Sequence, residues 1–119
     1  MEHIYQRMLE DILPAVAAGD AETCALVEQF GEGLSLTDGR LTFTLPALFS
    51  FTVARHNQAA QAAEQLSDDA HSYARFRELL FKHPPNETLA YFDLQVGIEL
   101  ADLDPDLIVY RLMRLEEAP

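Results

Sequence analysis

The feature that most constrains the fold is a strict alternation of apolar and polar residues near the C-terminal end. Over residues 92–100 the apolar positions are Phe92, Leu94, Val96, Ile98 and Leu100. Because successive side chains of a strand point to opposite faces, this pattern predicts a half-buried β-strand with a polar outer face. Such a strand needs a partner. Residues 107–115 are either a returning strand or a terminal helix, and the run Ile108, Val109 and Tyr110 favours the strand.

The first part of the chain has helical spacing instead. Apolar residues recur every three or four positions over 3–18, which predicts a helix that ends at Gly19. Pro14 predicts a kink in this helix or a restart of it. Asp20 is expected to cap a second helix over 21–30, so that the two helices form a hairpin.

The middle of the chain begins with a predicted β-hairpin. Residues 34–36 and 41–45 alternate apolar and polar, and Asp38 and Gly39 between them are typical of a tight turn. Residues 47–57 fit either a third strand or a buried helix. We favour the helix, because these residues lead into an alanine-rich stretch.

A fourth helix is predicted before the proline pair that begins at Pro84, with Ser67 as its N-cap. Its inward residues are expected to be Tyr73, Phe76, Leu80 and Phe81. The sequence therefore predicts a single α+β domain over residues 1–119. It consists of an N-terminal helical hairpin, a β-hairpin, two further helices and a C-terminal antiparallel strand pair, with the helices on one face of a small sheet.

The distribution of charge limits the partners. The formal net charge is −12, and it comes from the two ends of the chain. Residues 1–39 hold eight carboxylates and one base, and residues 87–119 hold eight carboxylates and two bases. Such a chain repels nucleic acid and anionic lipid and attracts basic proteins. With no leader-like start and no apolar run of membrane-spanning length, we expect a soluble, cytoplasmic protein that binds neither nucleic acid nor a membrane directly.

The candidate binding residues are carboxylates from both ends. Residues 102–106 are either a solvated turn in which Asp104 caps the next segment or, if extended, a ridge of carboxylates spaced roughly like phosphates. The preceding strand adds two acids on its outer face, and the helical hairpin adds four, although each could be an ordinary exposed acid. We expect folding to bring the two ends into one acidic face. The predicted partner-binding residues are Glu10, Asp11, Glu28, Glu32, Asp93, Glu99, Asp102, Asp104 and Asp106.

No motif in the sequence indicates catalysis or a cofactor, so we expect a protein that is not an enzyme and holds no metal. Asp102 begins a pattern similar to a calcium loop, but the sixth position is Leu107 instead of glycine and the twelfth is Met113 instead of glutamate. The four histidines do not have zinc-site spacing. Cys24, the single cysteine, lies in an acidic helical segment and is expected to be a small buried residue.

The charge pattern favours an acidic module that docks on a basic surface of a partner protein. One form of it is a DNA mimic that occludes a DNA-binding or histone-like protein. The bases Arg75, Arg77 and Lys82 are expected to pair with Glu78 and the acidic ends, within one chain or across a homodimer interface. Antitoxins, immunity proteins and secretion chaperones are also small and acidic, and the sequence does not separate them from this class.

A third class of function comes from a resemblance. Residues 17–22, Ala-Ala-Gly-Asp-Ala-Glu, precede a helix and then a strand that ends in Asp-Gly. This order is similar to the opening of cone-shaped α+β domains of the nuclear-transport-factor-2-like family, over residues 1–45. The resemblance implies a small-ligand or enzymatic pocket, while the long helical stretch 54–83 departs from that architecture. It transfers no site residues to this chain. A buried carboxylate with a raised pKa inside a cavity would favour this class.

Overall fold

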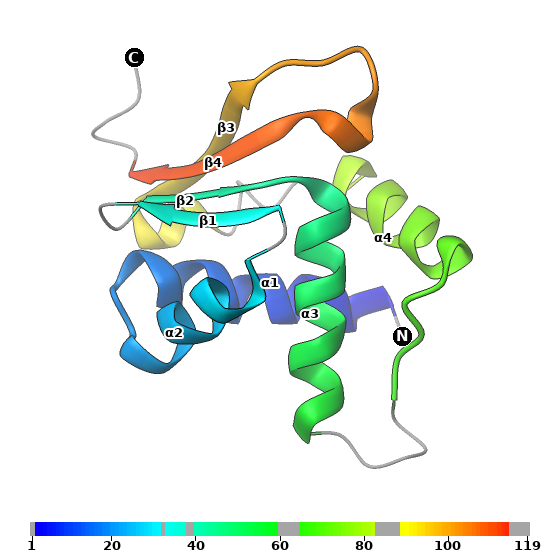
Figure 1. The fold of residues 1–119 in the computed structure, drawn as a ribbon, viewed down its shortest axis with the longest axis horizontal. Coiled ribbons are helices and arrows are strands. Elements are labelled where there is room, and N and C mark those ends of the chain that lie inside the picture. Colours follow the sequence, from blue (N-terminus) through cyan, green and yellow to red (C-terminus); the bar gives the residue numbers. More distant parts are fainter. Residues whose placement is uncertain (1, 32, 38–39, 60–64, 83–88, 115–119) are drawn as a thin grey trace.

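The computed structural model describes residues 2–31, 33–37, 40–59, 65–82 and 89–114. Its helices lie on one face of an antiparallel sheet, which confirms the predicted α+β fold (Figure 1). The helices are α1 (Glu2–Ala17), α2 (Ala21–Phe30), α3 (Leu45–Ala59) and α4 (Ala70–Lys82). The strands are β1 (Leu34–Thr37), β2 (Arg40–Phe43), β3 (Leu94–Leu100) and β4 (Val109–Arg114), in the order β1-β2-β4-β3. Two short 3-10 helices flank β3 and β4, namely η2 (Ala90–Phe92) and η3 (Pro105–Leu107).

The N-terminal helical hairpin forms as predicted. Helix α1 runs through Pro14 without a restart, and the carbonyl of Pro14 accepts a hydrogen bond from the Ala18 amide at 2.9 Å. Asp20 caps α2, because its Oδ2 accepts hydrogen bonds from the amide of Thr23 at 3.0 Å and from its hydroxyl at 2.7 Å. Gly31 ends α2 with a positive φ of 73°. The capping residues Asp20 and Gly31 therefore determine where α2 begins and ends.

The Asp20 cap makes stability depend on pH. The hydrogen bonds from the side chain and the amide of Thr23 lower the pKa of the Asp20 carboxyl. A lowered pKa stabilises the fold above the unfolded value of about 3.9, and that contribution is lost as pH falls through the folded value. We expect Asp20→Ala to lower the melting temperature more at about pH 7 than at about pH 2. Asp20→Asn, which keeps an acceptor oxygen, should lose less at about pH 7 than the alanine variant. An equal loss for Asp20→Ala at both pH values would contradict this account.

The middle of the chain contains the β-hairpin and the predicted helix. Strands β1 and β2 pair antiparallel from Leu34 opposite Phe43 to Thr37 opposite Arg40, and the predicted turn at 38–39 lies outside the described residues. Residues 47–57 are helical, within α3. Pro46 is the second residue of this helix, where its missing N–H costs no intrahelical hydrogen bond.

Helix α4 differs from the prediction at its start and at its inner face. It begins at Ala70, and Asp69 acts as its cap by accepting a hydrogen bond from the Ser72 amide at 2.8 Å. Ser67 is therefore not the N-cap; its hydroxyl accepts from the Asp69 amide at 3.3 Å and orders the turn before the helix. Phe76 is fully buried as expected, but Phe81 is 60% exposed, so its predicted inward position is wrong.

The core joins the helices through aromatic rings. The Phe76 ring centroid lies 5.2 Å from that of Phe49 in α3 and 5.4 Å from that of Tyr5 in α1. Phe49 also contacts Tyr73 of α4 at 5.5 Å. Edge-to-face and tilted contacts at these distances are favourable. Three helices separated in sequence are thus held against one another beneath the sheet.

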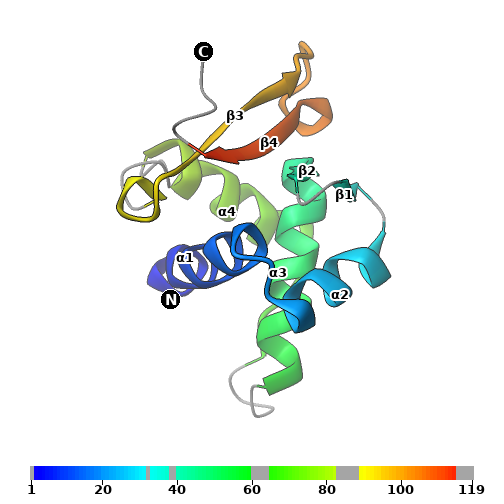
Figure 2. The ribbon, with the colours of Figure 1, turned by 90° about the vertical axis from the view of Figure 1, so that its left-hand side faces the viewer.

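The C-terminal strand pair is confirmed, because β3 and β4 pair antiparallel from Leu94 opposite Arg114 to Leu100 opposite Val109. The predicted burial of β3 holds only over its first half. Leu94 is buried and Val96 is half-buried, whereas Ile98 and Leu100 are more than half exposed. The β3–β4 hairpin extends beyond the helices (Figure 2), so the alternation continues where no helix covers the strand. Phe92 lies in η2 rather than in the strand, and it too is about half exposed.

Candidate functional site

Exposed apolar side chains occur along the β3–β4 hairpin and in the segment before it. Within the part of the chain that the structure describes, seven large apolar side chains are mostly exposed, and six of them lie between residues 91 and 107. These six are Tyr91, Phe92, Ile98, Leu100, Leu103 and Leu107. The seventh, Phe81, belongs to the last turn of α4 and lines an apolar groove of about 220 Å³ together with Ile98. Contiguous exposed apolar groups are typical of protein-binding surfaces, and Leu103 and Leu107 lie in one short turn.

Residues 100–107, which we call the hairpin tip, form a capped turn. Asp102 Oδ1 accepts a hydrogen bond from the Asp104 amide at 2.9 Å, and Asp104 Oδ1 accepts from the Asp106 amide at 2.9 Å, which caps η3. The segment is therefore the solvated turn, and not the extended ridge that phosphate-like spacing would require. Leu103 is fully exposed between Asp102 and Asp104, and Leu107 is 58% exposed. The tip thus presents leucine side chains beside carboxylates.

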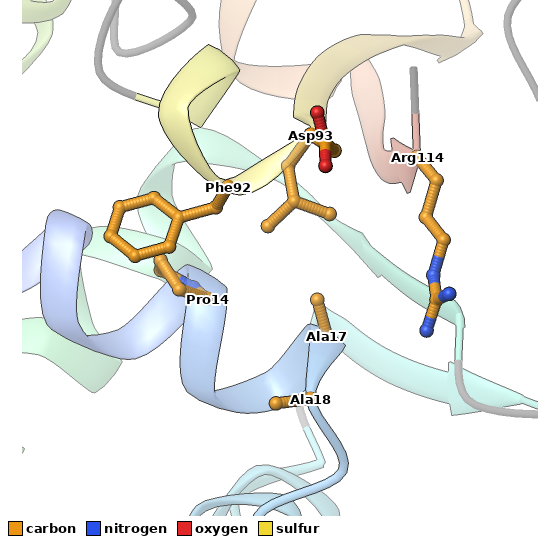
Figure 3. A pocket seen from close by; sticks show the side chains of 7 residues that line it. Pro14, Ala17, Ala18, Phe92, Asp93 and Arg114 are labelled. Carbon is orange, nitrogen blue, oxygen red and sulfur yellow. The ribbon is translucent and has the colours of Figure 1, made fainter. Parts of the chain in front are cut away.

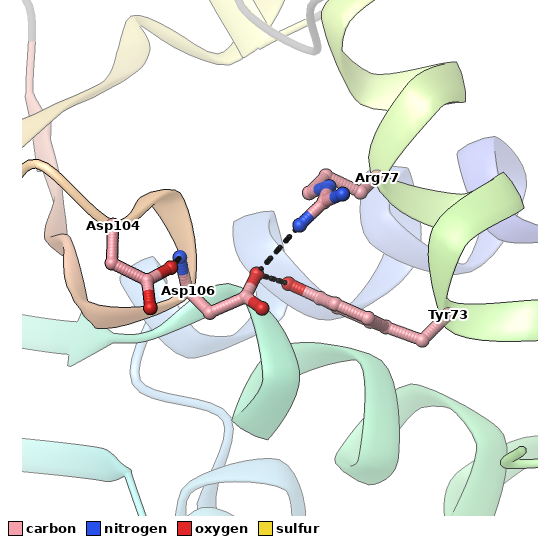
Figure 4. Close-up of polar contacts among 4 residues, drawn as sticks. All are labelled: Tyr73, Arg77, Asp104 and Asp106. Atoms are coloured by element: carbon pink, nitrogen blue, oxygen red, sulfur yellow. Dashed lines mark hydrogen bonds and ion pairs between the residues drawn. The ribbon is translucent and has the colours of Figure 1, made fainter. Parts of the chain in front are cut away.

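Asp106 points away from this surface and toward α4 (Figure 4). Its Oδ1 accepts a hydrogen bond from the Tyr73 hydroxyl at 2.5 Å and one from Arg77 Nη1 at 3.0 Å. Burial, reinforced by the Asp106 carboxylate, raises the pKa of Tyr73, and the hydrogen bond to Asp106 raises the pKa of Arg77. Asp106 therefore anchors the tip to α4, and its charge is balanced within the chain.

Two other ion pairs bear on the charge of the surface. Glu99, on the outer face of the sheet, pairs with Arg111 Nη1 at 3.1 Å. Lys82 pairs with Glu78 at 2.8 Å on the exposed side of α4. The predicted pairing of the central bases with Glu78 and with the acidic C-terminal part is thus confirmed for Lys82 and Arg77 within one chain. Glu99, like Asp106, is a partly neutralised carboxylate.

The sequence predicts Asp93 on the outer face of β3, and the structure shows that this placement is wrong. Asp93 precedes the strand, in a left-handed turn with a φ of 59° that ends η2. This backbone conformation is uncommon for residues other than glycine, although aspartate and asparagine tolerate it. The turn directs Asp93 to a hollow of about 660 Å³ between the end of α1 and the start of β3 (Figure 3). The other residues that line the hollow are Pro14, Ala17, Ala18, Phe92, Leu94 and Arg114.

The acids of the helical hairpin lie apart from the hairpin tip. Asp11 and Glu28 are exposed, Glu10 is half-buried, and Glu32 lies outside the described residues. Figure 1 places α2 at the lower left of the molecule and the hairpin tip at the upper right. The structure therefore brings Asp93 to the end of α1, but it separates Asp102 and Asp104 from the acids of α2. Among the described residues, the acids of α2 and those of the hairpin tip do not lie on one face.

Sequence reasoning missed the apolar part of this surface, because the charge pattern points only to carboxylates. The available signal for Leu103 and Leu107 was a pair of large apolar residues within a segment whose aspartates and proline predict a solvent-exposed turn. Tyr91 and Phe92 carried no comparable signal, because Phe92 matched the alternation of the following strand.

The described carboxylates and their neighbours bear on the metal and enzymatic alternatives. Among the described residues, no group of three or more His, Cys, Asp or Glu side chains lies close enough to hold a metal ion. The carboxyls whose pKa is shifted, those of Asp20, Asp69 and Glu78, are exposed, and hydrogen bonds lower the pKa of each. This is the opposite of the buried acid that an enzymatic pocket would favour. No described helix has the length and apolar character needed to cross a membrane.

Comparison with protein-family models, with curated proteins and with solved structures gives no match for this chain.

Proposed function

We propose that the protein is an acidic binding module that docks on a basic surface of a partner protein through its β3–β4 hairpin. The observation that carries this proposal is the exposed leucine pair of the hairpin tip, Leu103 and Leu107, beside the exposed carboxylates of Asp102 and Asp104. Protein interfaces typically combine apolar anchors with a polar rim. A hairpin tip held to α4 by Asp106 presents both on an ordered turn, which limits the entropy lost on binding.

The charge of the chain favours a basic partner. Asp102 and Asp104 form no ion pair with any residue that the structure describes, and the net charge of −12 steers basic proteins toward the molecule. A DNA-binding or histone-like protein is the proposed class of partner, because lysine and arginine side chains that bind phosphates also bind carboxylates. Occupation of its DNA-binding face would make the module a DNA mimic in effect.

The proposal is tested by titrating the protein with a histone-like DNA-binding protein over a series of salt concentrations. We expect the affinity to fall as salt rises, since salt screens exposed charges over about 10 Å at 0.1 M. Leu103→Ser combined with Leu107→Ser should weaken binding by about tenfold or more, the equivalent of at least ~1.4 kcal/mol. Duplex DNA added to the complex should displace the module if it covers the DNA-binding face.

Two control variants make this test specific. Ala54→Ser alters an exposed position of α3 away from the hairpin and should leave the affinity unchanged. Asp102→Asn with Asp104→Asn keeps the hydrogen-bond acceptors of the turn and removes two charges, so it should weaken binding and flatten its salt dependence. Binding that is absent at low salt, or that is the same for the leucine variant and the parent, would contradict the proposal.

A further inference from the structure

The face of the sheet that points away from the helices contains a hollow of its own. The helices lie on one face (Figure 1), which leaves the other face uncovered in the part of the chain that the structure describes. A hollow of about 580 Å³ lies there, which we call the outer hollow. Its lining residues are Thr37, Arg40, Thr42, Glu99, Arg111, Leu112 and Met113. Two bases and one acid line it, which is the reverse of the balance in the whole chain.

The strand register gathers hydrogen-bond donors at the outer hollow. Thr37 of β1 lies opposite Arg40 of β2. Thr42 of β2 lies opposite Arg111 of β4. Because Arg40 and Thr42 are two residues apart in one strand, all four side chains project from the same face of the sheet. Hydroxyl and guanidinium groups from three strands therefore meet where a group that accepts several hydrogen bonds can bind.

Arg111 has unused hydrogen-bonding capacity. Its Nη1 donates to Glu99 Oε2 at 3.1 Å. Its Nε is enclosed and has no acceptor among the described residues, and a buried donor in this state costs about 1–3 kcal/mol. Nε–H and Nη2–H lie along one edge of the planar guanidinium, where two oxygens of an oxyanion can bind in parallel. The contact with Glu99 uses Nη1 and does not occupy this edge.

Gly97 leaves space beside this edge of Arg111. It lies opposite Arg111 in the register of β3 and β4. A Cβ at Gly97 would clash with the end of the Met113 side chain and would lie 4.0 Å from Arg111 Nε. The Met113 side chain therefore lies over the glycine and near Nε, and a methionine side chain is flexible enough to turn aside. An oxyanion that displaces it reaches Nε and Nη2 together.

The charge at the outer hollow favours an anion, although the chain as a whole is acidic. At about 0.1 M salt, exposed charges more than about 10 Å apart are largely screened, so the nearest charges decide. Those that line the outer hollow are Arg40, Arg111 and Glu99, and their sum is positive. A phosphate group offers three acceptor oxygens and about two negative charges, more than a carboxylate does. The donors of the outer hollow therefore suit phosphate better than carboxylate.

We propose that the outer hollow binds the phosphate group of a small organic molecule, held by the Nε–Nη2 edge of Arg111 and the hydroxyls of Thr37 and Thr42. The volume of about 580 Å³ leaves room for the rest of the molecule, since ligand pockets typically measure about 300–1,000 Å³. This inference goes beyond the proposed function, because it assigns an anionic ligand to a different face of the molecule.

The test is an NMR titration of the ¹⁵N-labelled full chain with inorganic phosphate, phenyl phosphate and acetate, at neutral pH and constant ionic strength. We expect saturable shifts of the backbone amides at residues 40–42, 97–99 and 111–113. The Nε–H signal of Arg111 should shift with them, because it gains an acceptor. Phenyl phosphate should bind at least as tightly as inorganic phosphate, and acetate about fivefold more weakly or less. An Arg111 Nε–H signal that does not move, acetate that binds as tightly as phosphate, or exclusion of the ester would overturn the assignment.

Three variants make the test specific to this site. Arg111→Lys keeps the charge but removes the planar edge, so it should raise the dissociation constant for phenyl phosphate by about fivefold or more. Glu99→Gln removes the carboxylate that lines the outer hollow and should lower the constant by about two- to fivefold. Asp102→Asn is the charge-matched control, because it removes a carboxylate of the hairpin tip and should change the constant less than Glu99→Gln does. Equal effects of the two charge variants, or unchanged binding by Arg111→Lys, would contradict the proposal.

Discussion

Replacement of Phe76 by alanine is expected to lower the free energy of unfolding by about 3–5 kcal/mol. The side chain is fully buried, and its ring contacts those of Tyr5 and Phe49 at the junction of α1, α3 and α4. Small domains have a total stability of about 5–15 kcal/mol, so this loss brings the variant close to unfolding. Urea denaturation followed by circular dichroism measures the effect.

Phe81→Ala is the matched control for this prediction. It removes the same side chain from the same helix, five residues later, but Phe81 is 60% exposed. We expect it to cost about 1 kcal/mol or less. Similar losses for the two variants would show that α4 does not pack through Phe76, and the arrangement of helices beneath the sheet would then be wrong.

Gly33→Ala is expected to destabilise the fold by about 2–5 kcal/mol through two separate costs. Gly33 has a φ of 75°, and a side chain in this left-handed conformation costs about 1–2 kcal/mol. An added Cβ would also lie 2.6 Å from the Cβ of Ala47 and 3.0 Å from Thr44 Oγ1, at the start of α3. Overpacking of this kind typically costs about 1–3 kcal/mol more. Thermal and urea unfolding measure the sum.

Gly19→Ala separates the two costs. Gly19 has a similar φ of 78°, but an added Cβ would meet nothing within 4 Å. This variant should therefore show the backbone cost alone, about 1–2 kcal/mol. A Gly19→Ala variant that is as unstable as Gly33→Ala would contradict the close approach between the residue before β1 and the first turn of α3.

Local sequence signals predict most helices and strands of this fold. They do not predict which side chains of those elements are buried. Asp20 and Gly31 bound α2 because capping chemistry acts over three or four residues. The alternation that predicts β3 also predicts that Ile98 is covered. Coverage depends on how far the helices reach beneath the strand, which a pattern within the strand does not encode. Asp69, and not Ser67, caps α4. Both residue types are good N-caps, and the structure selects Asp69 because it directly precedes the first helical residue, Ala70.

The acidic character of the candidate site was predictable from the sequence, but the ion pairs that its carboxylates form within the chain were not. Asp106 is bound by Arg77, 29 residues away in sequence, and Glu99 by Arg111, 12 residues away. Such contacts arise from the packing of the hairpin on α4 and across the sheet, so counting charge along the chain overstates the free carboxylates. Leu103 shows the converse limit. A residue becomes a binding candidate when the fold leaves it uncovered, and that depends on the tertiary structure.

The central claim is that the hairpin side of the molecule, with its exposed leucines and free aspartates, contacts a basic partner. The most direct measurement is a map of backbone amide shifts when a histone-like DNA-binding protein is added to the ¹⁵N-labelled chain at low salt. We predict that the largest changes fall at residues 100–107, with further changes at 91–94, and that they diminish as salt is added. The largest changes on α2 or on the exposed side of α3, with the hairpin tip unaffected, would contradict it.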